Sequence, residues 1–257
     1  NRTLGSYSTV CGGYYNRADS SACVIAGGSH NWIRAHFATI SGGVENEIGD
    51  GTAAGRGGAS AICGGGYNRI LSAWSTICGG HADTILSGEF SIIGGGYSNK
   101  VHGSYIALLG GFDNFAGGDT SVILGGSRNY SGDIKSVICG GSDNTAFGAG
   151  SFIGGGTHNN TFQNLATVAG GTSNLAYGFA STVVGGYSNA AIRDYSTISG
   201  GQFDTIYAQG GFIGGGSKNS IGSIDTAIGN YSVICGGYQN KTTGNHSFIG
   251  GGEENYV

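Results

Sequence analysis

The chain has 257 residues, of which 56 are glycine and none is proline, and its formal net charge is −4. Collagen is excluded because proline is absent and glycine does not recur at every third residue. The even spread of Ile, Val, Leu, Phe and Tyr is atypical of disorder, and the 11 Lys and Arg residues form no cluster that would bind a nucleic-acid backbone.

A Gly-Gly pair at 12–13 opens a series that continues to 251–252. The first glycines of the pairs are Gly12, Gly27, Gly42, Gly64, Gly79, Gly95, Gly110, Gly125, Gly140, Gly155, Gly170, Gly185, Gly200, Gly215, Gly236 and Gly251. The spacing is 15 residues in twelve of the fifteen steps. We number each repeat from its first glycine, which is position 0. Position −2 is Ile, Val or Leu in every repeat, and it alternates with variable residues, which predicts a strand.

A repeat of 15 residues is too short for a pair of helices, and its Gly and Asn residues favour turns. We therefore predict an all-β fold, a β-solenoid of about sixteen 15-residue turns. The repetition is explained by burial, since one turn cannot bury its apolar side chains without its neighbours.

Positions −4, −2, +4 and +6 are predicted to point inward. Position +4 is Asn in fourteen repeats and Asp in two, and stacked amides can bond from turn to turn as a ladder. The predicted structural ladder is Asn16, Asn31, Asn46, Asn68, Asp83, Asn99, Asn114, Asn129, Asn144, Asn159, Asn174, Asn189, Asp204, Asn219, Asn240 and Asn255.

The length changes all lie between positions +8 and −6. They are the extra residue Gly88, the segment 51–57 and the segment 224–229. A corner that tolerates insertions faces solvent, so we expect Arg56 and Asp225 to be candidate receptor contacts. Both ends of the chain fall within a turn and show no capping segment. We therefore expect residues 1–257 to be one solenoid domain within a longer fibre chain. The chain has no run of about 18 apolar residues that would span a membrane.

The two outward faces differ in charge. Positions −5, −3 and −1 include one charged residue, Lys135, in 48 places, whereas positions +3, +5 and +7 include 13 in 47. The strand before the Gly pair is therefore expected to be buried on both sides, by association of identical chains. The predicted oligomer interface includes Cys11, Cys63, Cys78, Leu109, Leu124, Cys139, Phe152, Phe212, Cys235 and Phe248.

The motifs YSTVCGG, YSTISGG and YSVICGG begin at Tyr7, Tyr195 and Tyr231. They resemble the YadA-like (Hep/Hag) head repeats of trimeric autotransporter adhesins and related repeats of virus fibres, although those repeats are usually one residue shorter with a single Gly. The resemblance covers the whole chain. It implies a left-handed β-roll, a side-by-side homotrimer, and a place on an extracellular or virion surface.

Five of the six cysteines are at position −1, and Cys23 is at −4. Two interpretations stay open: small buried hydrophobic residues, or disulfides, either between Cys63 and Cys78 of adjacent turns or between chains. No Cys-x-x-Cys or His pair suggests a metal site.

Aromatic residues recur at position +7, where Phe147, Phe162, Tyr177 and Tyr207 are candidate receptor contacts. Exposed rings can stack on sugars, and they can equally stabilise neighbouring turns.

The sequence thus predicts a non-enzymatic adhesive rod with no catalytic residue, metal or cofactor. Its expected partners are copies of itself and a host-surface glycan or receptor, without nucleic acid. One alternative is ice binding through the Thr residues at position −3, although Phe152, Phe212 and Phe248 interrupt that column. The other is a fibre-borne glycan-cleaving enzyme, for which no paired acids are apparent.

Overall fold

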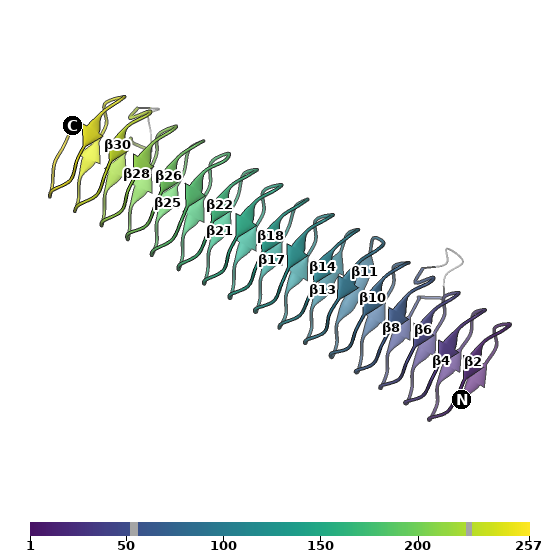
Figure 1. The fold of residues 1–257 in the computed structure, drawn as a ribbon. Helices are drawn as coiled ribbons and strands as arrows, with labels where there is room; N and C mark the ends of the chain where they lie inside the picture. The colour runs from purple at the N-terminus through teal and green to yellow at the C-terminus, as the bar shows by residue number, and fades with distance from the viewer. Residues whose placement is uncertain (52–55, 225–227) are drawn as a thin grey trace. The chain divides into compact units, whose positions relative to one another are not determined.

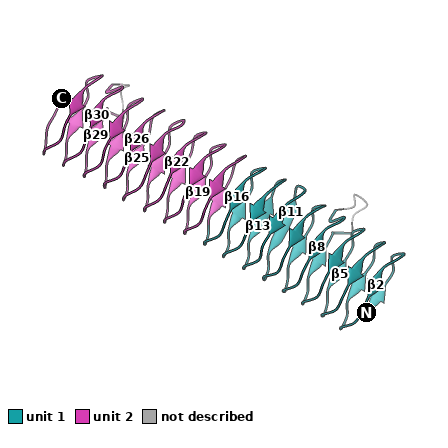
Figure 2. Cartoon of the chain, viewed as in Figure 1, with its two compact units in different colours: residues 1–128 teal, residues 129–257 magenta. Residues whose placement is uncertain are grey.

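The computed structural model describes residues 1–51, 56–224 and 228–257, which form strands and turns without a helix. They build a parallel β-solenoid of about sixteen turns spaced roughly 15 residues apart, which confirms the predicted all-β solenoid (Figure 1). The chain divides into two compact units, unit 1 over residues 1–128 and unit 2 over residues 129–257 (Figure 2). Asp225 lies outside the described residues.

Each turn of unit 1 contributes one strand to each of two parallel sheets. The odd-strand sheet contains β1 (Arg2–Thr3), β3 (Arg17–Ala18), β5 (Trp32–Ile33), β7 (Glu47–Ile48), β9 (Arg69–Ile70), β11 (Thr84–Ser87), β13 (Lys100–His102) and β15 (Phe115–Ala116). The even-strand sheet contains β2 (Thr9–Val10), β4 (Val24–Ile25), β6 (Thr39–Ile40), β8 (Ala61–Ile62), β10 (Thr76–Ile77), β12 (Ile92–Ile93), β14 (Ala107–Leu108) and β16 (Val122–Ile123).

Unit 2 repeats this arrangement. Its odd strands are β17 (Tyr130–Ser131), β19 (Thr145–Ala146), β21 (Asn160–Thr161), β23 (Leu175–Ala176), β25 (Ala190–Ala191), β27 (Thr205–Ile206), β29 (Ser220–Ile221) and β31 (Lys241–Thr242). Its even strands are β18 (Val137–Ile138), β20 (Phe152–Ile153), β22 (Thr167–Val168), β24 (Thr182–Val183), β26 (Thr197–Ile198), β28 (Phe212–Ile213), β30 (Val233–Ile234) and β32 (Phe248–Ile249).

The register between turns explains why neighbouring repeats have nearly the same sequence. In unit 2, β24 pairs in parallel with β26, so that Thr182 lies beside Thr197 and Val183 beside Ile198. Equivalent residues of successive turns are therefore neighbours across a ladder of backbone hydrogen bonds. Each turn must present the same kind of side chain, at the same place, as the turn before it.

The core of each unit is filled by the inward positions of both sheets. Ile25 and Ile33 of unit 1, and Ile198 and Ile206 of unit 2, are completely buried. Burial of one such side chain contributes about 1.5–3 kcal/mol to folding.

The second glycine of the pair is the more constrained of the two. Gly186 has a φ of +93°, and a Cβ atom there would lie 2.1 Å from the carbonyl oxygen of Gly201 in the next turn. A Cβ atom on the first glycine, Gly200, would meet nothing within 4 Å. The second position therefore excludes side chains both by backbone conformation and by the close approach of the next turn.

Candidate functional site

The position +4 side chains form a continuous internal ladder in each unit. In unit 1, Nδ2 of Asn31 donates to the carbonyl oxygen of Gly27 at 3.1 Å and to that of Gly43 in the next turn at 2.9 Å. Its Oδ1 accepts the backbone N–H of Asn46 at 3.1 Å. Ladder residues from Asn16 to Asn240 are at most 1% exposed, and Asn255 in the last turn is exposed. This network uses the donors and the acceptor of each amide, so it leaves none free for chemistry.

Asp83 and Asp204 occupy the same ladder with one difference. Both are fully buried, and in both the Oδ2 atom has no hydrogen-bond partner among the described residues. Burial raises the pKa of both carboxyl groups, although hydrogen bonds from Asn99 and Asn219 oppose the shift.

The even-strand sheet exposes an apolar surface in each unit, which we call the apolar face. It consists of the side chains at positions −5, −3 and −1. The large exposed members in unit 1 are Tyr7, Val24, Phe37, Trp74, Phe90, Ile92, Tyr105, Leu109 and Leu124. Those in unit 2 are Leu165, Val184, Tyr195, Phe212, Tyr231 and Phe248. Such contiguous exposed apolar area is typical of an interaction surface.

The predicted interface residues are distributed over this face. Leu109 is 51% exposed in unit 1 and Phe248 is 66% exposed in unit 2, while Phe152 is partly buried. Trp74, Phe90 and Tyr105 stack in successive turns of unit 1, with centroids 6.1 and 5.2 Å apart. The face is thus formed by ordered ring stacks as well as by aliphatic side chains.

All six cysteines are free thiols. Cys11, Cys63, Cys78 and Cys235 are exposed on the apolar face and Cys139 is partly exposed there. Cys63 and Cys78 directly follow the paired residues Ile62 and Ile77 of adjacent turns. Burial, and secondarily the neighbouring Cys63, raises the pKa of Cys78, which disfavours its reactive thiolate form.

Cys23 is the inward exception. It is completely buried in unit 1, and burial raises its pKa. Its Sγ lies 2.9 Å from the carbonyl oxygen of Ala35, so it takes the place of the serines found at this position in other turns.

The position +7 aromatics form a stack that ends at Tyr177. The ring of Phe162 lies 5.4 Å from that of Phe147 and 5.4 Å from that of Tyr177. Ile192 occupies the next turn, and Tyr207 follows it without a ring partner among the described residues. Phe147 and Phe162 are therefore engaged in the stack, whereas Tyr177 and Tyr207 flank a gap.

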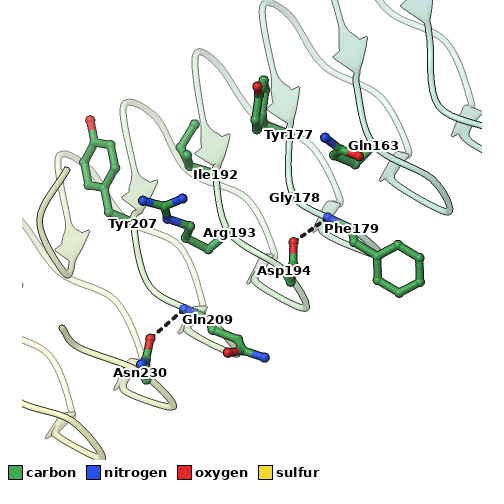
Figure 3. Close-up of a pocket in the computed structure, with 10 residues that line it drawn as sticks. All are labelled: Gln163, Tyr177, Gly178, Phe179, Ile192, Arg193, Asp194, Tyr207, Gln209 and Asn230. Atoms are coloured by element: carbon green, nitrogen blue, oxygen red, sulfur yellow. Dashed lines mark hydrogen bonds between the residues drawn. The ribbon is translucent and has the colours of Figure 1, made fainter. Parts of the chain in front are cut away.

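A groove of about 540 Å³ occupies that gap (Figure 3). Its lining residues are Gln163, Tyr177, Gly178, Phe179, Ile192, Arg193, Asp194, Tyr207, Gln209 and Asn230. Sequence reasoning identified two of them, Tyr177 and Tyr207. The available signal for Arg193 was a lone cation at position +8, between Gly178 of the preceding turn and Ala208 of the next.

Side chains at the corner organise the rim of this groove. Asp194 accepts the backbone N–H of Phe179 at 2.9 Å through Oδ1, and Asn230 accepts that of Gln209 at 2.9 Å (Figure 3). Each side chain satisfies a backbone donor of the preceding turn. The corner thus has a second, discontinuous ladder, which the sequence analysis did not anticipate.

Unit 1 carries a contrasting charged cluster on its odd-strand sheet. Arg34 and Arg69 both pair with Glu47, the latter at 3.1 Å, and the guanidinium of Arg34 lies 3.7 Å above the ring of Trp32. Nε1 of Trp32 donates to Asp19 at 2.9 Å. The acidic side chains of this cluster thus pair with its arginines.

Arg56, the described candidate of the 51–57 insertion, is exposed and lies 3.8 Å from Asp50. It also borders a smaller hollow with Leu71, Leu86 and Glu89. Over the described ranges no group of three His, Cys, Asp or Glu side chains is placed to hold a metal ion. In the same part of the chain no helix has the length and apolarity needed to cross a membrane.

No protein-family model matches the chain, and no curated protein matches its sequence.

Proposed function

We propose that this chain is a non-enzymatic, adhesive β-solenoid of an extracellular or virion-surface fibre. Three copies associate side by side through the apolar face, as in the left-handed β-rolls of YadA-like heads that the sequence resembles. Attachment is multivalent, because three identical copies add avidity to sites that are individually weak.

The observation that carries this proposal is the character of the apolar face. It exposes several large apolar side chains in each unit, and Lys135 is the one Lys, Arg, Asp or Glu at positions −5, −3 and −1. Leaving this surface in water forgoes about 25 cal/mol for each Å² that an interface would bury. A partner that covers it gains that free energy without desolvating many charges.

An identical chain is the partner that fits this face best. The face repeats every turn in register, so a second copy aligned in parallel presents the same spacing along its length. Aromatic and aliphatic side chains then meet their equivalents, which suits a closed symmetric assembly. The odd-strand sheet carries the charged residues and remains toward solvent.

The native mass in solution tests the proposal. Sedimentation equilibrium under reducing conditions is expected to give three times the chain mass of 25.7 kDa. Reducing conditions exclude a trimer held only by disulfides. A stable monomer would overturn both the trimer and its interface.

A pair of matched variants locates the interface. Phe212→Glu places a carboxylate on the outward side of β28, near its copies in the other chains, and is expected to shift the mass toward the monomer. Thr205→Glu places the same charge on the outward side of β27 and is expected to leave the trimer intact. Equal behaviour of the two variants would contradict the assignment of the interface to the even-strand sheet.

A further inference from the structure

We propose that the groove around Arg193 binds an acidic glycan, with Arg193 pairing to the carboxylate or sulfate of the sugar and Tyr177 and Tyr207 packing against its rings. The inference rests on the proposed adhesive function and supplies its ligand class. None of the residues that line the groove is at position −5, −3 or −1, although the ring of Phe179 lies 5.6 Å from that of Tyr195 on the apolar face.

Arg193 is an exposed cation at the groove. Its guanidinium has no carboxylate, hydrogen-bond acceptor or ring partner among the described residues, and its side chain extends from its turn toward Tyr207 (Figure 3). In unit 1, by contrast, Arg34 and Arg69 pair with Glu47. A guanidinium offers a planar fork of donors that matches a carboxylate or sulfate oxygen pair.

Two tyrosine rings flank the gap. Tyr177 and Tyr207 are two turns apart, which corresponds to about 9.6 Å at the usual strand spacing. Phe162 covers Tyr177 on the side away from the gap, and Tyr207 has no ring partner among the described residues. The shorter Ile192 lies between the two tyrosines and leaves room for a ligand. Tyrosine combines an apolar ring with a polar tip, which suits the mixed surface of a sugar.

Two side-chain amides also line the groove. The side chains of Gln163 and Gln209 line opposite ends of the groove and have no hydrogen-bond partner among the described residues. An amide both donates and accepts, so it can bond to sugar hydroxyls of either orientation. A volume of about 540 Å³ lies within the usual range for small-molecule sites, about 300–1,000 Å³.

A peptide is a poorer occupant. Peptides often bind by adding a strand to a free sheet edge, and here the backbone beside the groove already pairs with the next turn, as in Tyr207 N–H to Ile221 O at 2.8 Å. Separate polar groups and rings without a free edge are better suited to a saccharide.

The test titrates the full chain with four saccharides by saturation-transfer NMR: 3′-sialyllactose, tetragalacturonate, a chondroitin sulfate tetrasaccharide and neutral lactose. At least one acidic saccharide is expected to bind at least about tenfold more tightly than lactose. Arg193→Gln is expected to weaken that binding by about tenfold or more, the usual effect of losing a charge-assisted hydrogen bond. Lys218→Gln removes the same charge elsewhere in unit 2 and is expected to change binding less than about twofold.

Two further variants test whether the aromatic ring of Tyr207 contributes to binding. Tyr207→Phe keeps the ring and is expected to bind, whereas Tyr207→Ala is expected to bind roughly fivefold more weakly or worse. The proposal is overturned if no acidic saccharide binds, if Arg193→Gln binds as the parent does, or if a pentaglutamate peptide binds as well as the best saccharide. A trimer that binds none of the probes refutes the glycan site alone, while a monomer refutes the assembly, so the two failures are distinguishable.

Discussion

Asn174 and Asp204 occupy equivalent positions of the internal ladder and make different use of them. The backbone N–H of each donates to the Oδ1 of the preceding ladder residue at 3.0 Å. Nδ2 of Asn174 then donates to the carbonyl oxygens of Gly170 and Gly186, both at 3.0 Å. Asp204 presents Oδ2 at that point instead, buried and without a partner among the described residues.

Oδ2 of Asp204 occupies the position in its turn that Nδ2 of Asn174 occupies in its own. A Cβ atom placed on Gly171 would lie 2.6 Å from Nδ2 of Asn174, and one placed on Gly201 would lie 2.4 Å from Oδ2 of Asp204. An oxygen therefore faces the carbonyl groups that a donor serves elsewhere, and only a retained proton can satisfy it. Burial accordingly raises the pKa of Asp204. The comparison indicates that the ladder works through its donors rather than through its shape.

Removing a complete amide is expected to have the largest effect. Asn174→Ala leaves the carbonyl oxygen of Gly170 and the backbone N–H of Asn189 without their partner, while that of Gly186 keeps only the N–H of Thr172. At about 1–3 kcal/mol for each buried unsatisfied group, with partial relaxation, the free energy of unfolding falls by about 3–5 kcal/mol. Urea unfolding followed by circular dichroism measures this loss.

Ser173→Ala is the control, because Ser173 is exposed in the same turn. It is expected to change the free energy of unfolding by at most about 0.5 kcal/mol. If both variants unfolded at the same urea concentration, the ladder would not contribute the stability assigned to it.

Completing the ladder is expected to have the next largest effect, in the opposite direction. Asp204→Asn supplies the missing donor, so unfolding at pH 7 becomes less favourable by about 1–3 kcal/mol. Asp194→Asn changes the net charge equally at an exposed site whose Oδ1 still accepts the N–H of Phe179, and its effect is expected to be within about 0.5 kcal/mol. If both variants gained the same free energy of unfolding, the change in net charge would explain the effect and the added donor would not.

The pH dependence of that gain follows from the direction of the pKa shifts. In the unfolded chain the carboxyl groups of Asp83 and Asp204 have a pKa of 3.8. Above this pH the unfolded chain releases their protons while the folded chain, where their pKa is raised, retains them. The unfolded state then binds fewer protons, so stability falls as pH rises, until the raised folded pKa is passed. The slope is at most about 1.4 kcal/mol per pH unit for each group.

The double variant D83N/D204N removes both groups and is expected to flatten this part of the profile. Urea midpoints between pH 3 and 8 test the prediction, with the parent chain measured in parallel. A parent that gains stability relative to the double variant as pH rises would show that the carboxylates are stabilised in their charged form.

The sequence was sufficient for the features that recur in every turn. The Ile at position −2 and the Asn at +4 repeat because parallel in-register turns place each residue beside its equivalents, so the pattern along the chain is the pattern in space. It was not sufficient for features that depend on unlike neighbours. Arg193 lines a groove because Gly178 and Ala208 flank it, and Tyr207 is separated from the ring stack by Ile192. The unpartnered oxygen of Asp204 likewise depends on which carbonyl groups the amide serves.

Asp83 and Asp204 should differ slightly from each other, which is the smallest effect that we predict. His81 lies two residues before Asp83, and its positive charge when protonated lowers the pKa of that carboxyl group against the larger effect of burial. Gln202 occupies the same position relative to Asp204. His81→Gln should therefore raise the pKa of Asp83 and extend to higher pH the range over which stability declines.

The measurement is the urea midpoint as a function of pH in a D204N background, where Asp83 is the remaining ladder acid. His102→Gln, at another exposed histidine of unit 1, should leave the profile unchanged. If His81→Gln also left it unchanged, the two acids would be equivalent, with pKa values set by burial and by the opposing hydrogen bonds from Asn99 and Asn219.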